Sequence, residues 1–76
     1  MNNNYTITLT WDDEARVWIA TSEDVPGLVL ENDSLDLLIS RVRLAAPELL
    51  ELNCGYLGEA DVIFSMSHHE RLAANG

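Results

Sequence analysis

The sequence contains no lysine, and its four arginines face thirteen aspartates and glutamates, which gives a formal net charge of −9 at pH 7. Affinity for nucleic acids comes largely from lysines and arginines that neutralise phosphates, so this balance argues against direct DNA or RNA binding. The same charge is expected to steer a basic protein toward the chain. Acidity that only keeps a small domain in solution explains the composition equally well.

Cysteines and long apolar runs are also scarce. Cys54 is the only cysteine, so no disulfide forms within the chain, which suits a reducing cytoplasm. Asparagines follow Met1 in place of the basic and apolar segments of a signal peptide, and no apolar run is long enough to cross a membrane. We therefore expect a cytoplasmic protein that does not contact the membrane. A chain of 76 residues makes one small domain with a small core, for which self-association as a dimer is an expected remedy.

Hydrophobic patterns predict four strands and one helix in the order β-β-β-α-β. Near the start of the chain apolar residues alternate with threonines, which is the period of a strand with one buried face. Later, leucines and alanines recur at spacings of three and four, as on a helix that packs one stripe against a sheet. The expected strands span residues 5–11, 17–22, 28–31 and 60–66; the expected helix ends at Asn53 and Gly55, and its stripe contains Leu35, Leu38, Val42, Ala45, Leu49 and Leu52, widened by Leu37, Ile39 and Leu44.

Local signals mark the ends of these elements. Pro26 fixes φ at about −65° and Gly27 accepts a positive φ, a pair suited to a type II turn. We assign this pair a purely structural role. Ser34 is expected to cap the helix, and Asp36 is favourable in its first turn. Pro47 lies inside the helix, where it cannot donate a backbone hydrogen bond, so a kink or a short break is expected there.

This element order predicts an α+β fold in a single domain, with a core at about residues 5–66 and a tail at residues 67–76. The helix connects the third strand to the fourth, which we expect beside the first. The helix then covers one face of a small antiparallel or mixed sheet, in two layers. The other face stays uncovered and is available to a partner.

The two tryptophans occupy different positions relative to that face. Trp11 continues the apolar face of the first strand and is assigned to the core. In the second strand Trp18 and Ala20 share one face and Val17 and Ile19 share the other, so one of these pairs points away from the helix. Because aromatic residues at an interface often carry much of its binding energy, Trp18 is a candidate partner contact.

Candidate catalytic and metal-binding groups do not assemble into a recognisable site. Asp12–Glu14 are three consecutive acids that point in different directions at a hairpin turn, which fits a solvated turn better than a Ca²⁺ or Mg²⁺ site. A nuclease of the RNase H type needs acids that converge on two metals, whereas threonines occupy the middle of the first strand. Cys54 with His68 or His69 lacks a third orienting group, and the two histidines are expected at the surface. We therefore expect no enzymatic activity, metal or cofactor.

The segment Trp11–Leu28, WDDEARVWIATSEDVPGL, carries the most specific signal in the chain. It resembles the HicB-like antitoxin family, in particular a short stand-alone branch of unassigned function. The likeness continues through Asn32–Leu35 and Pro47–Asn53 and covers about residues 5–64. The resemblance implies a truncated RNase H-like fold and an antitoxin that blocks a small basic mRNA-cleaving toxin. Many family members add a DNA-binding segment after this fold, but the residues after Phe64 are too few and too acidic for one.

Two hypotheses for function follow. The first is an antitoxin-type module that neutralises a basic toxin through protein–protein contact, with Trp18, Glu23, Asp24 and Glu31 as partner-binding residues. The second is a stand-alone homo-oligomeric domain, structural or ligand-binding, without a toxin partner. A small basic open reading frame beside the gene favours the first hypothesis, and its absence favours the second.

Overall fold

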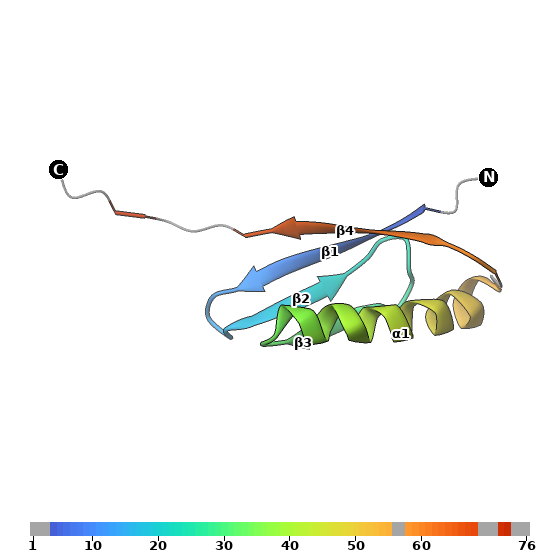
Figure 1. Ribbon diagram of the computed structural model, residues 1–76, viewed down its shortest axis with the longest axis horizontal. Coiled ribbons are helices and arrows are strands. Elements are labelled where there is room, and N and C mark those ends of the chain that lie inside the picture. The colour runs from blue at the N-terminus through green and yellow to red at the C-terminus, as the bar shows by residue number, and fades with distance from the viewer. Residues whose placement is uncertain (1–3, 56–57, 69–71, 74–76) are drawn as a thin grey trace.

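The computed structural model describes residues 4–55, 58–68 and 72–73. Four strands and one helix follow one another along the chain (Figure 1): β1 (Asn4–Asp12), β2 (Val17–Thr21), β3 (Val29–Asn32), α1 (Leu35–Cys54) and β4 (Asp61–Ser67). The predicted α+β fold with the order β-β-β-α-β is therefore confirmed, and the strand boundaries lie within a residue of the prediction.

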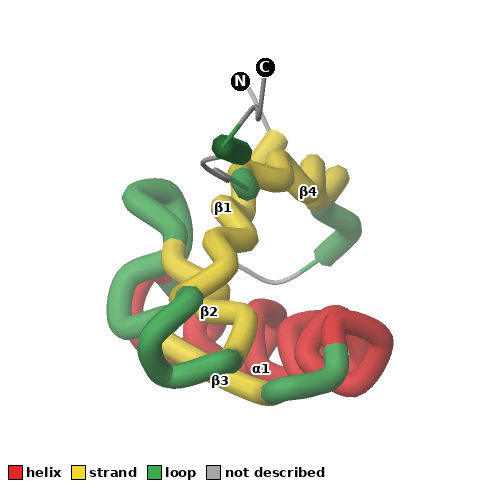
Figure 2. The backbone as a smooth tube through the Cα atoms, turned by 90° about the vertical axis from the view of Figure 1, so that its left-hand side faces the viewer, coloured by secondary structure: helices red, strands yellow, loops and turns green. Residues whose placement is uncertain are grey.

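The strands form one mixed sheet in the spatial order β3-β2-β1-β4. The pairs β1–β2 and β2–β3 are antiparallel, while β4 runs parallel to β1. A parallel neighbour needs a long crossover connection, and α1 supplies it. The end-on view shows α1 on one side of the sheet, close to β2 and β3, with β4 farther away beyond β1 (Figure 2).

The core lies between α1 and the sheet face that carries the odd-numbered residues of β1. Leu9 of β1 is paired with Ala20 of β2, and Ala20 is paired with Leu30 of β3, so these three side chains share the helix side. The buried core residues come from the first two strands, the loop before β3 and the helix: Ile7, Leu9, Ala20, Val25, Leu28, Leu38, Val42, Ala46 and Leu50.

One narrow ridge of α1 reaches this core. Its buried residues are spaced by four, namely Leu38, Val42, Ala46 and Leu50. The predicted stripe is wrong at its last residue, Leu52, which is 81% exposed, and at two of the residues that widen it, Leu37 and Leu44, which are also exposed. The backbone of α1 comes closest to β2 and β3, and only the ridge that faces the sheet is buried, so the flanks of the stripe stay exposed.

The predicted ends of α1 are confirmed. The Ser34 hydroxyl accepts a hydrogen bond from the Leu37 amide at 3.4 Å, and Gly55 adopts a left-handed conformation with φ 65°. The Gly55 amide donates to the Glu51 carbonyl at 3.1 Å. The helix continues through Pro47 as one element, so the alternative of a break at that residue is wrong.

The Pro26–Gly27 turn is also confirmed. The Leu28 amide donates to the Val25 carbonyl at 3.2 Å, and Gly27 has φ 85°, as a type II turn requires. The Asn53 side-chain amide donates to the Pro26 carbonyl at 3.2 Å, which ties the turn to the last turn of α1. Val25 and Leu28 are buried on either side of the turn, so it directs two core residues inward.

In the part of the chain that the structure describes, no helix is both long and apolar enough to span a membrane.

Candidate protein-binding face

The sheet face opposite α1, the uncovered face, has no second layer of described residues over it. The pairing register places Thr10 beside Ile19 and Ile19 beside Glu31, so the three side chains project to this side. By the same register the face contains Thr6, Thr8 and Thr10 of β1; Val17, Ile19 and Thr21 of β2; Val29 and Glu31 of β3; and Asp61, Ile63, Ser65 and Ser67 of β4. Short hydroxyl side chains and a few branched apolar ones thus make up most of the residues on this face.

The charges of the uncovered face are acidic. None of the four strands contains a lysine or an arginine. Glu31 lies on β3 and Asp61 on β4, near opposite edges of the sheet, and both are exposed. Among the described residues, the arginines lie in the β1–β2 turn, at Arg16, or on α1, at Arg41 and Arg43. The face therefore carries a negative potential that no basic side chain on its own strands offsets.

A shallow hollow lies on this face where β2 ends. It is open to solvent and has a volume of ≈ 590 Å³. Its walls come from β1, the end of β2, the start of β3 and the loop that joins β2 to β3: Thr6, Thr8, Thr21, Ser22, Glu23, Asp24, Gly27, Leu28 and Val29. Val29 is 71% exposed at its edge. The polar side chains of the hollow carry hydroxyl and carboxylate oxygens, which accept hydrogen bonds from cationic side chains.

Asp24 has a structural role that the sequence did not reveal. Its Oδ2 accepts a hydrogen bond from the Thr6 amide at 2.8 Å. The neighbouring Ser22 hydroxyl donates to the Thr6 carbonyl at 2.6 Å and accepts from the amides of Asp24 at 3.0 Å and Val25 at 3.1 Å. Side chains thus continue the hydrogen bonding of β1 past the end of β2. Asp24 adds charge to the face, but its carboxylate is already engaged.

Trp18 and Ala20 do not point to the uncovered face. Trp18 is paired with Trp11, and both lie on the side of α1; Ala20 is fully buried there. Val17 and Ile19 are therefore the pair on the uncovered face. The expectation that Trp18 contacts a partner from that face is wrong in its placement, because a strand that is apolar on both sides does not show from its own pattern which side the helix covers.

The tryptophans instead form an aromatic cluster at the hairpin end of the sheet. The ring centroids of Trp11 and Trp18 are 5.5 Å apart. The His68 ring, just after β4, stacks on Trp11 at 6.2 Å and meets the edge of Trp18 at 5.9 Å. The Arg16 guanidinium carbon lies 5.7 Å from the Trp11 ring centroid. His68 is exposed, as expected, and its ring also connects the end of β4 to the β1–β2 hairpin.

The acidic hairpin residues serve the turn. Asp12 Oδ1 accepts hydrogen bonds from the amides of Glu14 at 3.1 Å and Ala15 at 3.2 Å. Asp13 Oδ1 accepts from the Trp11 indole at 3.3 Å. These contacts fix the turn and the tryptophan beside it. Within the described residues, no three histidine, cysteine, aspartate or glutamate side chains are grouped to hold a metal ion.

The structure does not bring Cys54 and His68 together. Cys54 is exposed at the end of α1, near the start of β4, whereas His68 follows the other end of that strand (Figure 1). The remaining member of the candidate pair, His69, lies outside the described residues.

Residues 4–75 match the family described as a domain of unknown function, DUF1902. The chain belongs to this family. This DUF1902 chain is also similar to a solved structure, that of the hypothetical protein TTHA1013 from the extremely thermophilic bacterium Thermus thermophilus. The two share 37% sequence identity with a TM-score of 0.70, over 93% of this chain and 99% of the other. No curated protein matches the DUF1902 chain.

Proposed function

We propose that this DUF1902 chain is a HicB-like, antitoxin-type binding module that neutralises a small basic mRNA-cleaving toxin by protein–protein contact. The observation that carries the proposal is the uncovered face, where four strands without lysine or arginine present apolar and hydroxyl side chains beside carboxylates. The resemblance of Trp11–Leu28 to HicB-like antitoxins supports the same partner.

The face combines the two features that a protein interface needs. Ile19 and Val29 supply apolar surface near β3, while Glu31 lies beside Ile19 on the neighbouring strand. Apolar side chains at the centre of a contact contribute most of its affinity, and a charged rim contributes steering and specificity. A partner with basic residues around an apolar patch complements this arrangement.

Inhibition then needs no chemistry from the antitoxin. A toxin that cleaves mRNA has to attract phosphates with basic residues. Carboxylates such as those of Glu23 and Glu31 compete with the phosphates for the same basic surface. Occupying that surface is sufficient to exclude RNA, so the contact surface, and not a reactive group, performs the function.

The test applies where a small basic protein is encoded next to this chain: that protein is purified, and its cleavage of an mRNA is the readout. Addition of the wild-type chain is expected to abolish cleavage at an equimolar ratio. Glu31→Lys should weaken the inhibition strongly. Glu48→Lys is the matched control, because it changes the net charge equally from an exposed position on α1. Equal effects of both variants, or cleavage that persists in an excess of wild-type chain, contradict the proposal.

A second candidate is a stand-alone, self-associating domain with no toxin partner. It is favoured by apolar side chains that remain exposed along β4, such as Val62 and Met66. A chain that self-associates but neither binds nor inhibits the neighbouring basic protein fits this candidate.

A further inference from the structure

β4 is an edge strand without the usual protection. It lies at one end of the sheet and pairs only with β1 among the described strands. Natural proteins blunt such edges with short strands, lysines, prolines or bulges, because an open edge pairs readily with another chain. β4 has seven residues, DVIFSMS, with one charge, at Asp61. The opposite edge strand, β3, has only four residues and carries Glu31.

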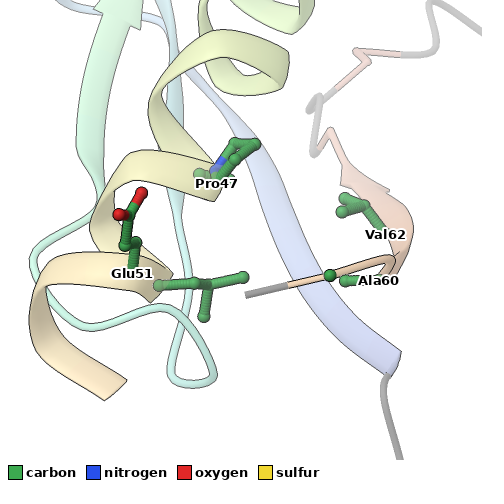
Figure 3. Close-up of a pocket in the computed structure, with 7 residues that line it drawn as sticks. Pro47, Glu51, Ala60 and Val62 are labelled. Carbon is green, nitrogen blue, oxygen red and sulfur yellow. The ribbon is translucent and has the colours of Figure 1, made fainter. Parts of the chain in front are cut away.

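Apolar side chains of β4 are exposed on both sides of the sheet. Val62 and Met66 are 37% and 57% exposed on the helix side, and Ile63 is 49% exposed on the other. In the described part of the chain, α1 does not pack closely against this strand. Between them runs an apolar groove with adjoining volumes of ≈ 320 and ≈ 420 Å³, and Figure 3 shows Pro47 and Glu51 of α1 on one side with Ala60 and Val62 on the other.

We propose that a second copy of this chain pairs its β4 antiparallel with this edge, about a two-fold axis that passes beside Phe64. Phe64 is the middle residue of β4, so this register pairs the strands along their full length. An axis perpendicular to the sheet keeps both helices on the same side. The two sheets then form one continuous sheet, with Phe64 opposite Phe64 of the second copy.

The side chains of β4 complement one another in this register. Val62 lies opposite Met66 of the second copy, so the exposed apolar residues on the helix side cover each other. On the uncovered face, Ile63 lies opposite Ser65. Each Asp61 lies opposite a Ser67, and the two carboxylates are at opposite ends of the paired strands.

The charge distribution selects this edge for contact between copies. Each chain carries a net charge of −9, so two copies repel one another unless their contact avoids the acids. Glu31 lies on β3, at the far edge of the sheet from β4. Pairing through β4 therefore keeps the Glu31 side chains of both copies apart, whereas pairing through β3 brings them together. Salt should strengthen the dimer, because it screens the remaining repulsion.

Sedimentation equilibrium of the full chain tests the interface. The wild-type protein should have twice the chain mass of 8.5 kDa. Val62→Asp/Met66→Asp places like charges opposite each other and should give monomers. The matched variant Val62→Lys/Met66→Asp places opposite charges there and should restore the dimer. A monomeric wild type, or two variants with the same mass, overturns the proposal.

Disulfide trapping tests the register in a Cys54→Ser background. Ile63→Cys and Ser65→Cys chains, mixed under mild oxidation, should form a mixed disulfide much faster than either chain alone, because positions 63 and 65 face each other across the axis. Equal trapping in the mixture and in the separate proteins overturns the register. This interface would be the contact surface of the second candidate function, the self-associating domain. Its tests do not depend on a toxin, because inhibition of the basic protein is measured in a separate experiment.

Discussion

At Ser22 a single hydroxyl group satisfies three backbone groups. It donates to the Thr6 carbonyl and accepts from the amides of Asp24 and Val25. The Asp24 carboxylate accepts a further hydrogen bond, from the Thr6 amide. Polar residues that look available to a partner in the sequence thus hold the loop after β2 against β1. Glu23, between them, is exposed on the wall of the hollow and keeps its place among the proposed partner contacts.

Ser22→Ala is expected to lower the free energy of unfolding by about 1–2 kcal/mol, because it leaves backbone groups without their partner. Thermal unfolding followed by circular dichroism, at one fixed protein concentration, measures the loss. Glu23→Ala, the exposed neighbour, is the control and should change the melting temperature little. Equal shifts for the two variants contradict this account of the loop.

Gly27→Val should destabilise the protein by about 1 kcal/mol or more, since Gly27 has φ 85° and a β-branched side chain is strained there. An added Cβ also lies 3.5 Å from Leu49 Cδ2, which is ordinary contact, so strain and not a clash is the main cost. The melting temperature should fall by several degrees. For Gly27→Asn the fall should be smaller, because asparagine tolerates positive φ better; an unchanged curve for the valine variant shows that the turn tolerates the side chain.

Among the elements, α1 and β4 differ in how completely they are buried. α1 places a ridge of residues spaced by four over β2 and β3. β4 completes the sheet beside β1 but receives little cover from α1, which leaves the groove that Pro47 and Val62 line. The groove therefore lies between two elements that are each regular in themselves.

Pro47→Ala should stabilise α1. Proline in a helix interior is about 3 kcal/mol less favourable than alanine, partly offset by the about 1 kcal/mol that proline contributes through the unfolded chain. The restored amide can donate to the carbonyl of Arg43. We expect a higher melting temperature than for Ser40→Ala, an exposed control on the same helix. A lower melting temperature shows that the proline ring stabilises the protein through its contacts at the wall of the groove by more than it destabilises the helix.

Across the protein as a whole, charge and surface shape divide the chain into two regions. The uncovered face carries the acids Glu31 and Asp61 and suits a basic partner. The β4 edge carries a single charge along seven residues and suits a second copy. Charges attract each other in the contact with a basic partner and repel each other in the contact between two copies. Rising ionic strength should therefore weaken the first contact and strengthen the second.

If the chain binds a basic toxin as proposed, their association should slow as salt rises, since the Debye length shrinks from about 10 Å at 0.1 M to about 3 Å at 1 M. Stopped-flow mixing of the two proteins at several salt concentrations measures the rate. Dissociation should change much less, because apolar contacts such as those of Ile19 are insensitive to screening. Glu31→Lys should reduce the salt dependence, and an association rate indifferent to salt contradicts electrostatic steering.

Short stretches of sequence were enough to define the elements and their ends. Alternation in β1, the Ser34 cap, the Gly55 terminus and the Pro26–Gly27 turn each depend on a few adjacent residues. Local conformational preferences decide such features, so they can be predicted before any tertiary contact is known. The same local signals supplied the element order, and with it the place of β4 beside β1.

The covered side of β2 and the width of the buried ridge on α1, in contrast, became known only from the folded chain. Val17 and Ile19, not Trp18 and Ala20, lie on the uncovered face. Because β2 is apolar on both sides, its pairing register with β1 decides which of its side chains face the helix. Leu52 remained exposed because the buried ridge of α1 is a single row of residues spaced by four, which is narrower than the apolar stripe of the helix. Contacts between residues far apart in the sequence settle these choices, and hydrophobic periodicity carries no information about them.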